Sequence, residues 1–266
     1  MRKYLILALA ALTLAACAPK PKLVIIHTND THSHLEPVRT GEDAGRGGII
    51  ERAAFVDSVR RAQGAGSVLL LHAGDFGQGT SYFSEFGGEL EIDMINALGY
   101  DCVTLGNHEF DNGLEDLAKR LSRLECPVVC ANIDLAPVGL DQYVRPYVIL
   151  ERAGMKIGII GTTSDLSTNV AASISSRIQQ LDTVESVNRC ISELRDVCDL
   201  LILLSHSGFD EDCELVPQTR GLDLVIGGHS HYDLDEVREL VDADGNKVPM
   251  VTDGAFGINL GEVKVW

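Results

Sequence analysis

The chain has 266 residues, with 22 lysines and arginines against 39 aspartates and glutamates, which gives a formal net charge of −17. Hydrophobic residues make up 45% of it and charged residues 23%, values typical of a folded globular protein. A sequence pI near 4.7 argues against nucleic-acid binding through a basic surface, because the phosphate backbone requires a positively charged footprint. If the protein handles a small anion, something other than its net charge must attract it, and a metal is the obvious candidate.

The first 22 residues have the pattern of an export signal and a tether. Two basic residues precede an apolar run from Tyr4 to Ala16, which is too short for a membrane-spanning helix of about 20 residues. The tetrapeptide LAAC that ends at Cys17 resembles a bacterial lipobox, after which cleavage leaves a lipidated cysteine. We therefore predict a lipoprotein signal peptide over residues 1–16, and a lipidated Cys17 with a tether over residues 17–22. An ordinary cleaved signal or an anchor helix is the alternative.

This interpretation predicts a protein of the bacterial cell envelope that a lipid anchor holds to a membrane, facing the periplasm or the exterior. Removing residues 1–16 takes away Arg2 and Lys3 and no acid, which brings the net charge to −19.

Six of the seven cysteines remain once Cys17 carries lipid, and their spread lacks the density of a disulfide scaffold. Cys126 and Cys130 lie four residues apart in an expected strand, about 13 Å, too far for a disulfide. No second short-spaced pair completes a zinc knuckle. We predict that most of the six are small buried apolar residues. They are Cys102, Cys126, Cys130, Cys190, Cys198 and Cys213.

Apolar runs that end in polar, glycine-rich turns alternate with helical periodicity along the rest of the chain. In chain order the expected elements are strand 23–27, helix 49–63, strand 67–75, a helix from 89 that stops at Gly99, strand 101–107, a helix from 113 to about 124, strand 127–133, a hairpin over 145–163 that turns at Ala153-Gly154, helix 184–197, and strands within 199–208, 223–231, 248–253 and 258–266. The repeated order of strand, loop and helix, with antiparallel pieces near the middle and end, predicts an α/β fold with a mixed sheet or two stacked sheets.

Residues suited to metal binding follow five of these strands, where open α/β sheets place their ligands. They are Asp30, His32, Asp75, Asn107, His108, His206, His229 and His231. In extended backbone residues i and i+2 point the same way, so Asp30-x-His32 and His229-x-His231 are each able to chelate one ion. Mixed carboxylate and imidazole ligands suit zinc, manganese, iron or cobalt better than calcium or magnesium. One carboxylate between two such sets would bridge two metals.

Any one of these motifs alone is a weak indication, since an isolated Asp-x-His is far more often a solvated turn. Five of the eight histidines, however, fall at these strand ends beside glycines and carboxylates. Clustering on that scale favours a metal site over chance. We expect His27, His34 and His72 to be structural, with His34 placed to support a ligand.

The ordered series resembles the motifs of the calcineurin-like metallophosphoesterases. Its parts are Asp30-x-His32, Gly74-Asp75, the GNHE of residues 106–109, His206, and the GHSH of residues 228–231. The longer strings HTNDTHSH, LGNHEFDNG and IGGHSH resemble the 5′-nucleotidase and UDP-sugar hydrolase branch. The resemblance runs from about Leu23 to the end of the chain. It implies a metallophosphoesterase catalytic domain over residues 23–266, folded as a four-layer αββα sandwich of two mixed sheets, with two divalent metal ions.

The resemblance also implies roles for individual residues. One metal would be held by Asp30, His32, Asp75 and His231, and the other by Asp75, Asn107, His206 and His229. His108 would lie beside the scissile phosphate with Asp111 as its orienting partner, while Glu109 looks structural. The implied reaction is hydrolysis of phosphomonoesters, foremost 5′-nucleotides, by a metal-bridging hydroxide. Two divalent ions with two aspartates and a hydroxide leave the site near +1, which answers how an acidic protein would bind an anion.

The sequence departs from that family pattern in one respect. The 5′-nucleotidases usually continue into a C-terminal domain whose aromatic residues stack on the nucleobase, whereas this sequence ends at Trp266. One alternative is therefore the catalytic subunit of a split nucleotidase that needs a separate substrate-binding chain. A phosphodiesterase or UDP-sugar hydrolase of the same family is another, and an inactive metal-binding lipoprotein is less favoured because His108 and Asp111 are both present. Three aromatic residues, Tyr82, Phe83 and Phe86, are expected to pack in a loop against the sheet rather than to line the site.

Overall fold

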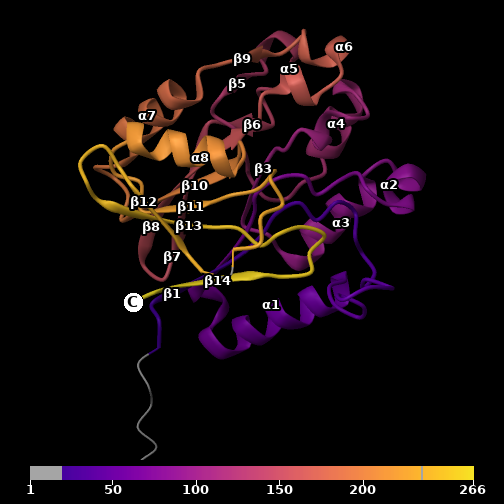
Figure 1. Ribbon diagram of the computed structural model, residues 1–266, viewed down its shortest axis with the longest axis horizontal. Coiled ribbons are helices and arrows are strands. Elements are labelled where there is room, and N and C mark those ends of the chain that lie inside the picture. Colours follow the sequence, from indigo (N-terminus) through magenta and orange to yellow (C-terminus); the bar gives the residue numbers. More distant parts are fainter. Residues whose placement is uncertain (1–19, 235) are drawn as a thin grey trace, which may run out of the picture.

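The computed structural model describes residues 20–234 and 236–266. The predicted signal peptide over residues 1–16 and Cys17 lie outside the described residues. The described chain forms two sheets that lie face to face, with helices on both outer sides (Figure 1). The predicted four-layer α/β sandwich is confirmed.

The first sheet is parallel apart from one edge strand. Its strands, in spatial order, are β14 (Gly261–Val265), β1 (Leu23–Thr28), β2 (Val68–His72), β3 (Cys102–Thr104), β4 (Val128–Val129) and β6 (Val144–Arg145). Only β14 is antiparallel to its neighbour, so the remaining strands end at the same edge of the sheet.

The second sheet has a parallel centre and antiparallel strands at both edges. Its order is β12 (Arg238–Val241), β13 (Lys247–Val251), β11 (Leu224–Ile226), β10 (Leu200–His206), β8 (Met155–Thr163) and β7 (Tyr147–Arg152). The hairpin between β7 and β8 turns at Ala153 and Gly154 as predicted, with φ of 54° and 72°. A small separate pair joins β5 (Ile133–Asp134) and β9 (Gln179–Gln180).

The helices follow the apolar periodicity of the sequence. The longer ones are α1 (Ile49–Gln63), α3 (Glu89–Leu98), α4 (Leu114–Leu121), α7 (Thr183–Leu194) and α8 (Phe209–Leu215), and the short ones are α2 (Ser81–Phe86), α5 (Leu166–Asn169) and α6 (Ala172–Ser175). α1 has the predicted bounds, and Gly99 ends α3 in a left-handed conformation with φ of 65°.

One predicted strand is wrong in detail. Residues 127–133 form not one strand but two short ones, β4 and β5, with Asn132 between them. The Asn132 side chain accepts a hydrogen bond from the Thr163 N–H at 2.9 Å and donates one to the Thr163 carbonyl at 2.8 Å. The amide therefore takes the place of a backbone pair, and the chain can leave the first sheet without losing buried hydrogen bonds.

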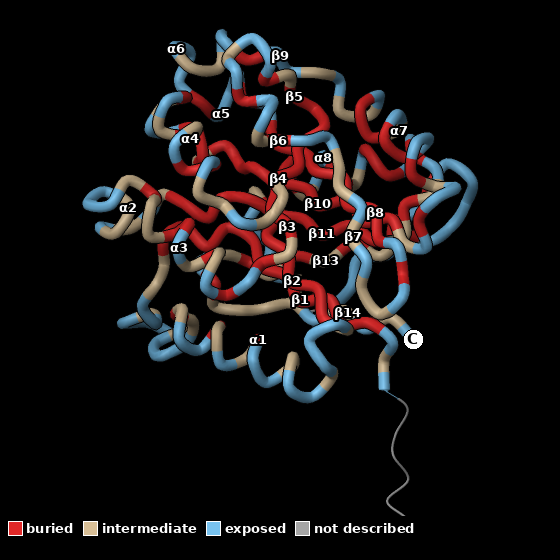
Figure 2. The backbone as a smooth tube through the Cα atoms, turned by 180° about the vertical axis from the view of Figure 1, so that it is seen from behind, coloured by how far each residue is buried: buried red, intermediate tan, exposed pale blue. Residues whose placement is uncertain are grey.

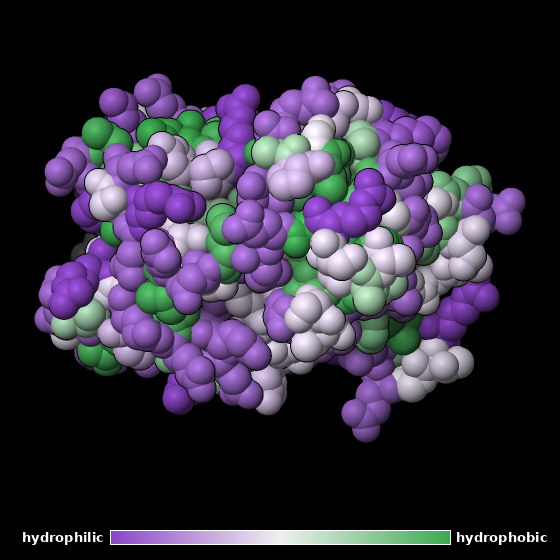
Figure 3. Space-filling view, turned by 90° about the horizontal axis from the view of Figure 1, so that it is seen from above, coloured by the Kyte–Doolittle hydropathy of each residue, from purple (hydrophilic) through white to green (hydrophobic). Residues whose placement is uncertain are grey.

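Three groups of buried apolar side chains lie between the four layers. Leu23 and Ile25 of one sheet pack with Ile202 and Leu204 of the other. The opposite face of the first sheet packs against α1, α3 and α4, and that of the second against α7 and α8. Both faces of each sheet are thus covered, which explains why the central strands are continuous apolar runs (Figure 2). The surface seen from above is mostly hydrophilic, with hydrophobic residues in scattered groups (Figure 3).

The cysteine prediction is confirmed for the described residues. All six cysteines are free thiols, four of them buried and two, Cys126 and Cys213, half-buried. Burial raises the pKa of the Cys130 thiol to about 12. Among residues 20–234 and 236–266 no helix has the length and apolar character needed to cross a membrane.

Candidate active site

The two sheets deliver metal-type ligands to one place from their strand ends. Asp30 and His32 follow β1 and Asp75 follows β2 of the first sheet, while His206 ends β10 and the 229–231 segment follows β11 of the second. The structure sorts these side chains into two triads whose ligand atoms lie within 4.8 Å of one another. The triads are Asp30, His32 and His231, and Asp75, His206 and His229. Each triad therefore takes ligands from both sheets.

The first triad has the spacing of ligands around a single ion. His32 Nε2 lies 3.0 Å from His231 Nε2, and His231 Nε2 lies 3.3 Å from Asp30 Oδ1. The distance from His32 Nε2 to Asp30 Oδ1 is 3.8 Å. Two ligands about 2.1 Å from a zinc ion at a tetrahedral angle lie about 3.4 Å apart, so these separations fit a shared cation.

The second triad is joined to the first through Asp75. Asp75 Oδ2 lies 3.0 Å from His206 Nε2 and 3.9 Å from His32 Nε2 of the other triad. One carboxylate oxygen thus faces ligands of both sets, which is the position expected of a bridging residue. Asp75 itself is 2% exposed.

The chain orients each carboxylate so that one oxygen is held and the other faces the triads. Asp30 Oδ2 accepts hydrogen bonds from Asn29 Nδ2 at 2.7 Å and from the His229 N–H at 2.9 Å. Asp75 Oδ1 accepts one from the His108 N–H at 2.9 Å. Asp30 Oδ1 is buried and has no hydrogen-bond partner in the described chain. A buried carboxylate oxygen without a donor is costly, and a bound cation would satisfy it.

His206 is oriented in the same manner. Its Nδ1 lies 2.6 Å from the Ala73 carbonyl oxygen, to which it donates, so Nε2, the atom that carries the lone pair in the neutral ring, faces Asp75. Nε2 is buried and has no hydrogen-bond partner among the described residues. Although burial opposes it, the charges of Asp75 and Asp30 raise the pKa of His206. The site therefore favours positive charge strongly, and the donor set fits two divalent cations.

Five of these residues have a backbone conformation that is rare outside glycine. The φ angles are 47° at Asp30, 45° at His32, 53° at Asp75, 72° at His229 and 55° at His231. Each such left-handed residue costs about 1–3 kcal/mol and persists only where the surroundings enforce it. Backbone bonds pair the two loops of the first sheet, from Asp30 N to Gly74 O at 3.0 Å and from His32 N to Asp75 O at 3.1 Å. Strain concentrated on these residues is typical of a functional site.

The extended-strand argument for the two spaced pairs is therefore wrong. Left-handed backbone, not a strand, turns Asp30 and His32 toward the same point. His229 and His231 do not share one ion site: His229 joins Asp75 and His206, whereas His231 joins Asp30 and His32. The two residue sets implied by the family resemblance agree with this division.

A glycine is required where these loops approach most closely. A Cβ added to Gly106 would lie 2.0 Å from Asp75 Oδ1 and 2.6 Å from the Asp75 backbone nitrogen, so movement of the carboxylate alone would not relieve the contact. Gly74 has φ of 85°, and its Cβ would lie 2.6 Å from His206 Nδ1. The glycines of the GD and GNHE motifs thus allow the carboxylate and imidazole to reach their positions.

Glu109 supports the loop that carries Asp75, as the sequence indicated. Its Oε2 accepts from the Asp75 and Gly106 N–H groups at 2.8 and 2.7 Å, and its Oε1 from the Phe76 and Gly77 N–H groups at 3.0 and 3.2 Å. Burial and then the Asp75 charge raise its pKa to about 7. With all four acceptor sites used inside the protein, this carboxylate is structural.

His108 and Asp111 lie at the rim of the site. His108 Nδ1 lies 2.8 Å from Asp111 Oδ2, and this hydrogen bond raises the pKa of His108. The His108 ring centroid is 5.3 Å from that of His32. Asn107 is buried beside it, and its Oδ1 accepts from Ser164 Oγ at 3.4 Å.

An open cleft of about 540 Å³ leads to both triads. Its lining includes His32, Asp75, Asn107, His108, His229 and His231. Of the nine predicted site residues other than Cys17, the cleft thus brings six together, with Asp30 and His206 buried beneath and Asp111 behind His108.

The three histidines expected to be structural lie outside both triads. His27 pairs with Asp253 at 2.7 Å, and His72 Nε2 lies 3.0 Å from Thr31 Oγ1. His34 supports a ligand loop, since its Nδ1 donates to the His32 carbonyl at 2.8 Å.

Two residues of the site were missed. Asn29 donates from Nδ2 to Asp30 Oδ2 and to the Gly254 carbonyl, both at 2.7 Å, and so ties the first triad to the C-terminal segment. Phe256 donates its N–H to the Asp30 carbonyl at 2.7 Å, and its ring lies against His32, His34 and His231. Asn29 could have been identified from the sequence because it lies next to Asp30, whereas no local sequence pattern identifies Phe256.

The expectation for the aromatic segment is also wrong. Residues 81–86 form helix α2, not a loop, because Thr80 caps it by accepting from the Tyr82 N–H at 3.2 Å. Phe86 is 51% exposed, while Tyr82 lines a cleft beside the site.

The fold and the paired triads are those of a known class of protein. Residues 23–233 match the family described as calcineurin-like phosphoesterase. The chain belongs to this family.

Its relatives point to one branch. The chain is 36% identical over 265 residues to a probable 5′-nucleotidase of Treponema pallidum (strain Nichols), a match that covers 92% of the chain and 45% of the relative. It is 37% identical over 286 residues to a 5′-nucleotidase of Bos taurus, covering 98% of the chain and 49% of the relative. Among solved structures, a 5′-nucleotidase precursor from Thermus thermophilus has a TM-score of 0.84 at 33% identity and covers 91% of this chain and 51% of that one. The chain spans about half the length of these relatives.

Proposed function

We propose that the protein is a metal-dependent phosphomonoesterase that hydrolyses 5′-nucleotides. The observation that carries this proposal is the pair of triads, joined through Asp75, on the cleft that His108 lines. The relatives named 5′-nucleotidase support nucleotides as substrates over the UDP-sugar and diester alternatives.

The residues proposed as metal ligands form two sets. The first metal would be held by Asp30, His32, Asp75 and His231, and the second by Asp75, Asn107, His206 and His229. Two divalent ions would lower the pKa of a bound water toward about 7 and offset the charge of the phosphate. Zinc, manganese, iron and cobalt all suit this mixture of imidazole, carboxylate and amide donors.

His108 would act on the phosphoester itself. The Asp111 hydrogen bond favours the imidazolium form, which places a positive charge and a proton at the rim of the cleft. In hydrolysis the His108 Nε2–H stabilises charge that develops on the phosphoryl oxygens, or passes its proton to the departing alkoxide. Asp111 is therefore a positioning residue for His108.

The charge balance explains how an acidic protein can bind a phosphate. The net charge is −17, but the ligand sets contribute two aspartates against two divalent ions. The cleft becomes a local cationic site, and cleft walls of low dielectric focus its field on an approaching anion.

The experiment is a phosphate-release assay on a panel of phosphoesters with zinc, manganese, iron and cobalt. We expect metal-dependent release from nucleoside monophosphates, which Asp75→Asn abolishes and His108→Ala slows by about 100-fold or more. Asp57→Asn, on the exposed face of α1, is the matched control and should retain full activity. A metal-loaded protein that releases no phosphate from any member of the panel would refute the proposal.

Membrane attachment remains a proposal from the sequence. The LAAC string that ends at Cys17 supports lipidation of that cysteine and a location in the cell envelope. Expression with a clickable palmitate analogue should label the wild type and not Cys17→Ser, and an unlabelled wild type would contradict this assignment.

A further inference from the structure

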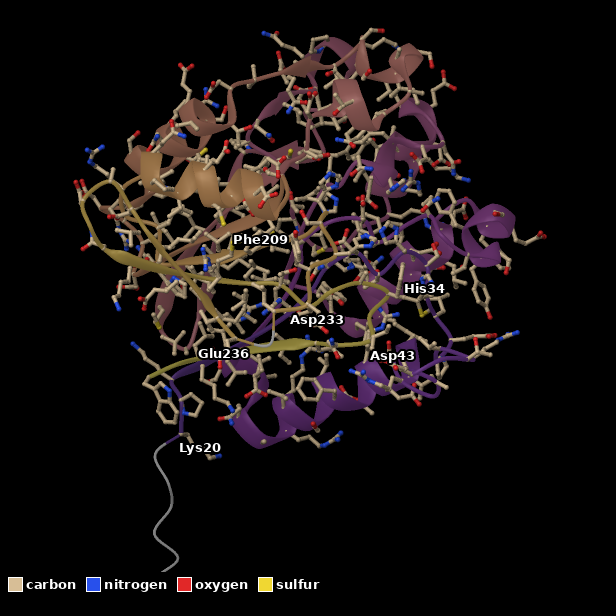
Figure 4. The ribbon with its side chains drawn as sticks, viewed as in Figure 1. Lys20, His34, Asp43, Phe209, Asp233 and Glu236 are labelled. Atoms are coloured by element: carbon tan, nitrogen blue, oxygen red, sulfur yellow. The ribbon has the colours of Figure 1, made fainter. Side chains whose placement is uncertain are left out.

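A small cavity lies behind the loop that carries His32. Residues of that loop, of β2 and of helices α1 and α3 form its walls. His34, labelled in Figure 4, lines it from the loop. The volume is about 20 Å³, far below the range of about 300–1,000 Å³ that organic ligands occupy, but above the roughly 10–15 Å³ that a water molecule needs. The cavity therefore has room for water and for no organic ligand.

Polar atoms without a partner are concentrated in the walls of this cavity. Glu91 of α3 is 4% exposed, and neither of its carboxylate oxygens accepts a hydrogen bond within the described chain. Ser33 Oγ and His72 Nδ1 are buried as well and are also unpaired among the described residues. Buried waters in proteins make about three hydrogen bonds to groups of this kind. Three such side chains around one small cavity therefore point to a shared partner.

The charges in the walls favour water over an ion. Arg52 of α1 lines the same cavity, and its Nη2 donates to the His34 carbonyl at 2.7 Å. Its positive charge opposes a cation, and the Glu91 carboxylate opposes an anion. Because burial lowers the pKa of His72 to about 3, its neutral ring offers one N–H and one lone pair. A water molecule can pair with either of these while it donates to the carboxylate.

The groups around the cavity also hold both neighbours of His32. Thr31 Oγ1 lies 3.0 Å from Nε2 of His72, and Ser33 is itself a wall residue. His32 and Ser33 have successive left-handed backbone conformations, with φ of 45° and 56°. Such strain persists only where the surroundings enforce it. The contacts around this cavity therefore help to keep the His32 imidazole directed at the other members of its triad.

We propose that this cavity is a binding site for a structural water molecule, which joins Glu91 of α3 to Ser33 of the loop, with His72 as its third partner. Glu91 is then a positioning residue for His32, because the water holds the loop that carries this ligand against α3. The proposal rests on the proposed function only in treating His32 as a metal ligand.

The first test locates the water directly. A high-resolution crystal structure of the metal-free wild type should show a water within about 3.2 Å of both a Glu91 carboxylate oxygen and Ser33 Oγ. Glu91→Met, whose apolar side chain can fill the space, should remove it. A wild-type cavity without this water, or a water that keeps its place in Glu91→Met, would overturn the proposal.

The second test measures whether the water positions His32. Zinc affinities of the wild type, Glu91→Met, Ser33→Ala and the double variant are compared by calorimetric titration. We expect each single variant to weaken one of two zinc sites by about tenfold, as loss of a group that supports a metal ligand does. If both side chains act through one water, the double variant should also lose about tenfold, whereas independent losses would multiply to about a hundredfold.

Two variants of α3 serve as controls. Glu91→Gln keeps an acceptor for the water and should retain most of the zinc affinity. Asp93→Asn makes the same chemical change on the exposed face of the helix and should change nothing. Circular dichroism checks that each variant is folded, and Ser33→Ala still tests the water if Glu91→Met fails to fold.

Three results would contradict the positioning role. They are unchanged zinc affinity in Glu91→Met, losses that multiply in the double variant, and an equal loss in Asp93→Asn, which would make the effect one of charge. Failure of the proposed function is distinguishable, because the water and the zinc affinities are measured without any phosphoester.

Discussion

Asp75 Oδ2 lies 3.0 Å from His206 Nε2, although Asp75 follows β2 of the first sheet and His206 ends β10 of the second. The same relationship holds in the other triad, where His231 of the second sheet meets Asp30 of the first at 3.3 Å. Bound cations would therefore connect the two sheets at their shared edge. Stability and metal binding should be linked in this protein.

Chelation tests that linkage. A ligand present at 100 times its dissociation constant stabilises the folded state by about 2.7 kcal/mol per site. We expect the melting temperature to fall by several degrees on removal of divalent metal and to recover when zinc or manganese is restored, as followed by circular dichroism. Equal melting temperatures with and without metal would contradict a link between the sheets.

Gly106→Ala should disrupt the site. The new Cβ would lie 2.0 Å from Asp75 Oδ1, so the Asp75 carboxylate must move away from its place between the two triads. We expect loss of metal binding, measured by elemental analysis after desalting, and a free energy of unfolding lowered by about 2 kcal/mol or more. Gly66→Ala is the matched control because a Cβ there contacts nothing within 4 Å. Normal metal content in Gly106→Ala would show that the loop can accommodate the added methyl group, contrary to this prediction.

Glu109→Gln should lower the stability of the protein strongly, although Glu109 has no catalytic role. Both carboxylate oxygens accept two backbone N–H groups each, and an amide NH₂ in either position leaves two of those donors unsatisfied. At about 1–3 kcal/mol per buried unsatisfied group, we expect the free energy of unfolding in urea to fall by roughly 2–6 kcal/mol. Glu115→Gln, exposed at the start of α4, should change little. A stability equal to wild type would mean that Glu109 does not hold this loop.

His72 makes the protein sensitive to acid. Burial lowers the pKa of its imidazole to about 3. Below about pH 6.5 the imidazole is therefore protonated in the unfolded chain and stays neutral in the folded chain until the pH approaches 3. Stability from this group is complete above about pH 6.5 and falls as the pH decreases toward 3. Between about pH 7 and pH 5 the loss is about 2 kcal/mol.

The measurement is urea unfolding of wild type and His72→Gln at both pH values, with chelator present throughout so that metal release does not contribute. The variant should lose about 2 kcal/mol less than wild type on acidification. Parallel losses in the two proteins would place the acid sensitivity elsewhere.

The fold was predictable because both faces of each central strand are covered. Continuous apolar runs such as residues 23–27 and 67–72 therefore identified the buried strands, and Gly99 marked the end of α3. The break at Asn132 was not predictable, since it depends on hydrogen bonds to Thr163, which is distant in sequence.

The sequence allowed us to predict which residues gather at the candidate site, but not how they are divided between the two triads. The residues stood out because they follow strand ends beside glycines. Spacing alone put His229 and His231 on one ion, whereas left-handed backbone at both positions sends them to different triads. Phe256 could not be foreseen, because its place beside His34 arises only when the C-terminal segment packs against the loop after β1.

We propose that two cations, one in each triad beside Asp75, make this cleft a phosphoesterase site. The most direct measurement is metal content per chain together with phosphate release from a nucleoside monophosphate, for wild type and Asp75→Asn. We predict two divalent ions per wild-type chain, fewer in the variant, and phosphate release that disappears with them. Phosphate release that persists in a chain stripped of divalent metal, or in Asp75→Asn, would contradict the account.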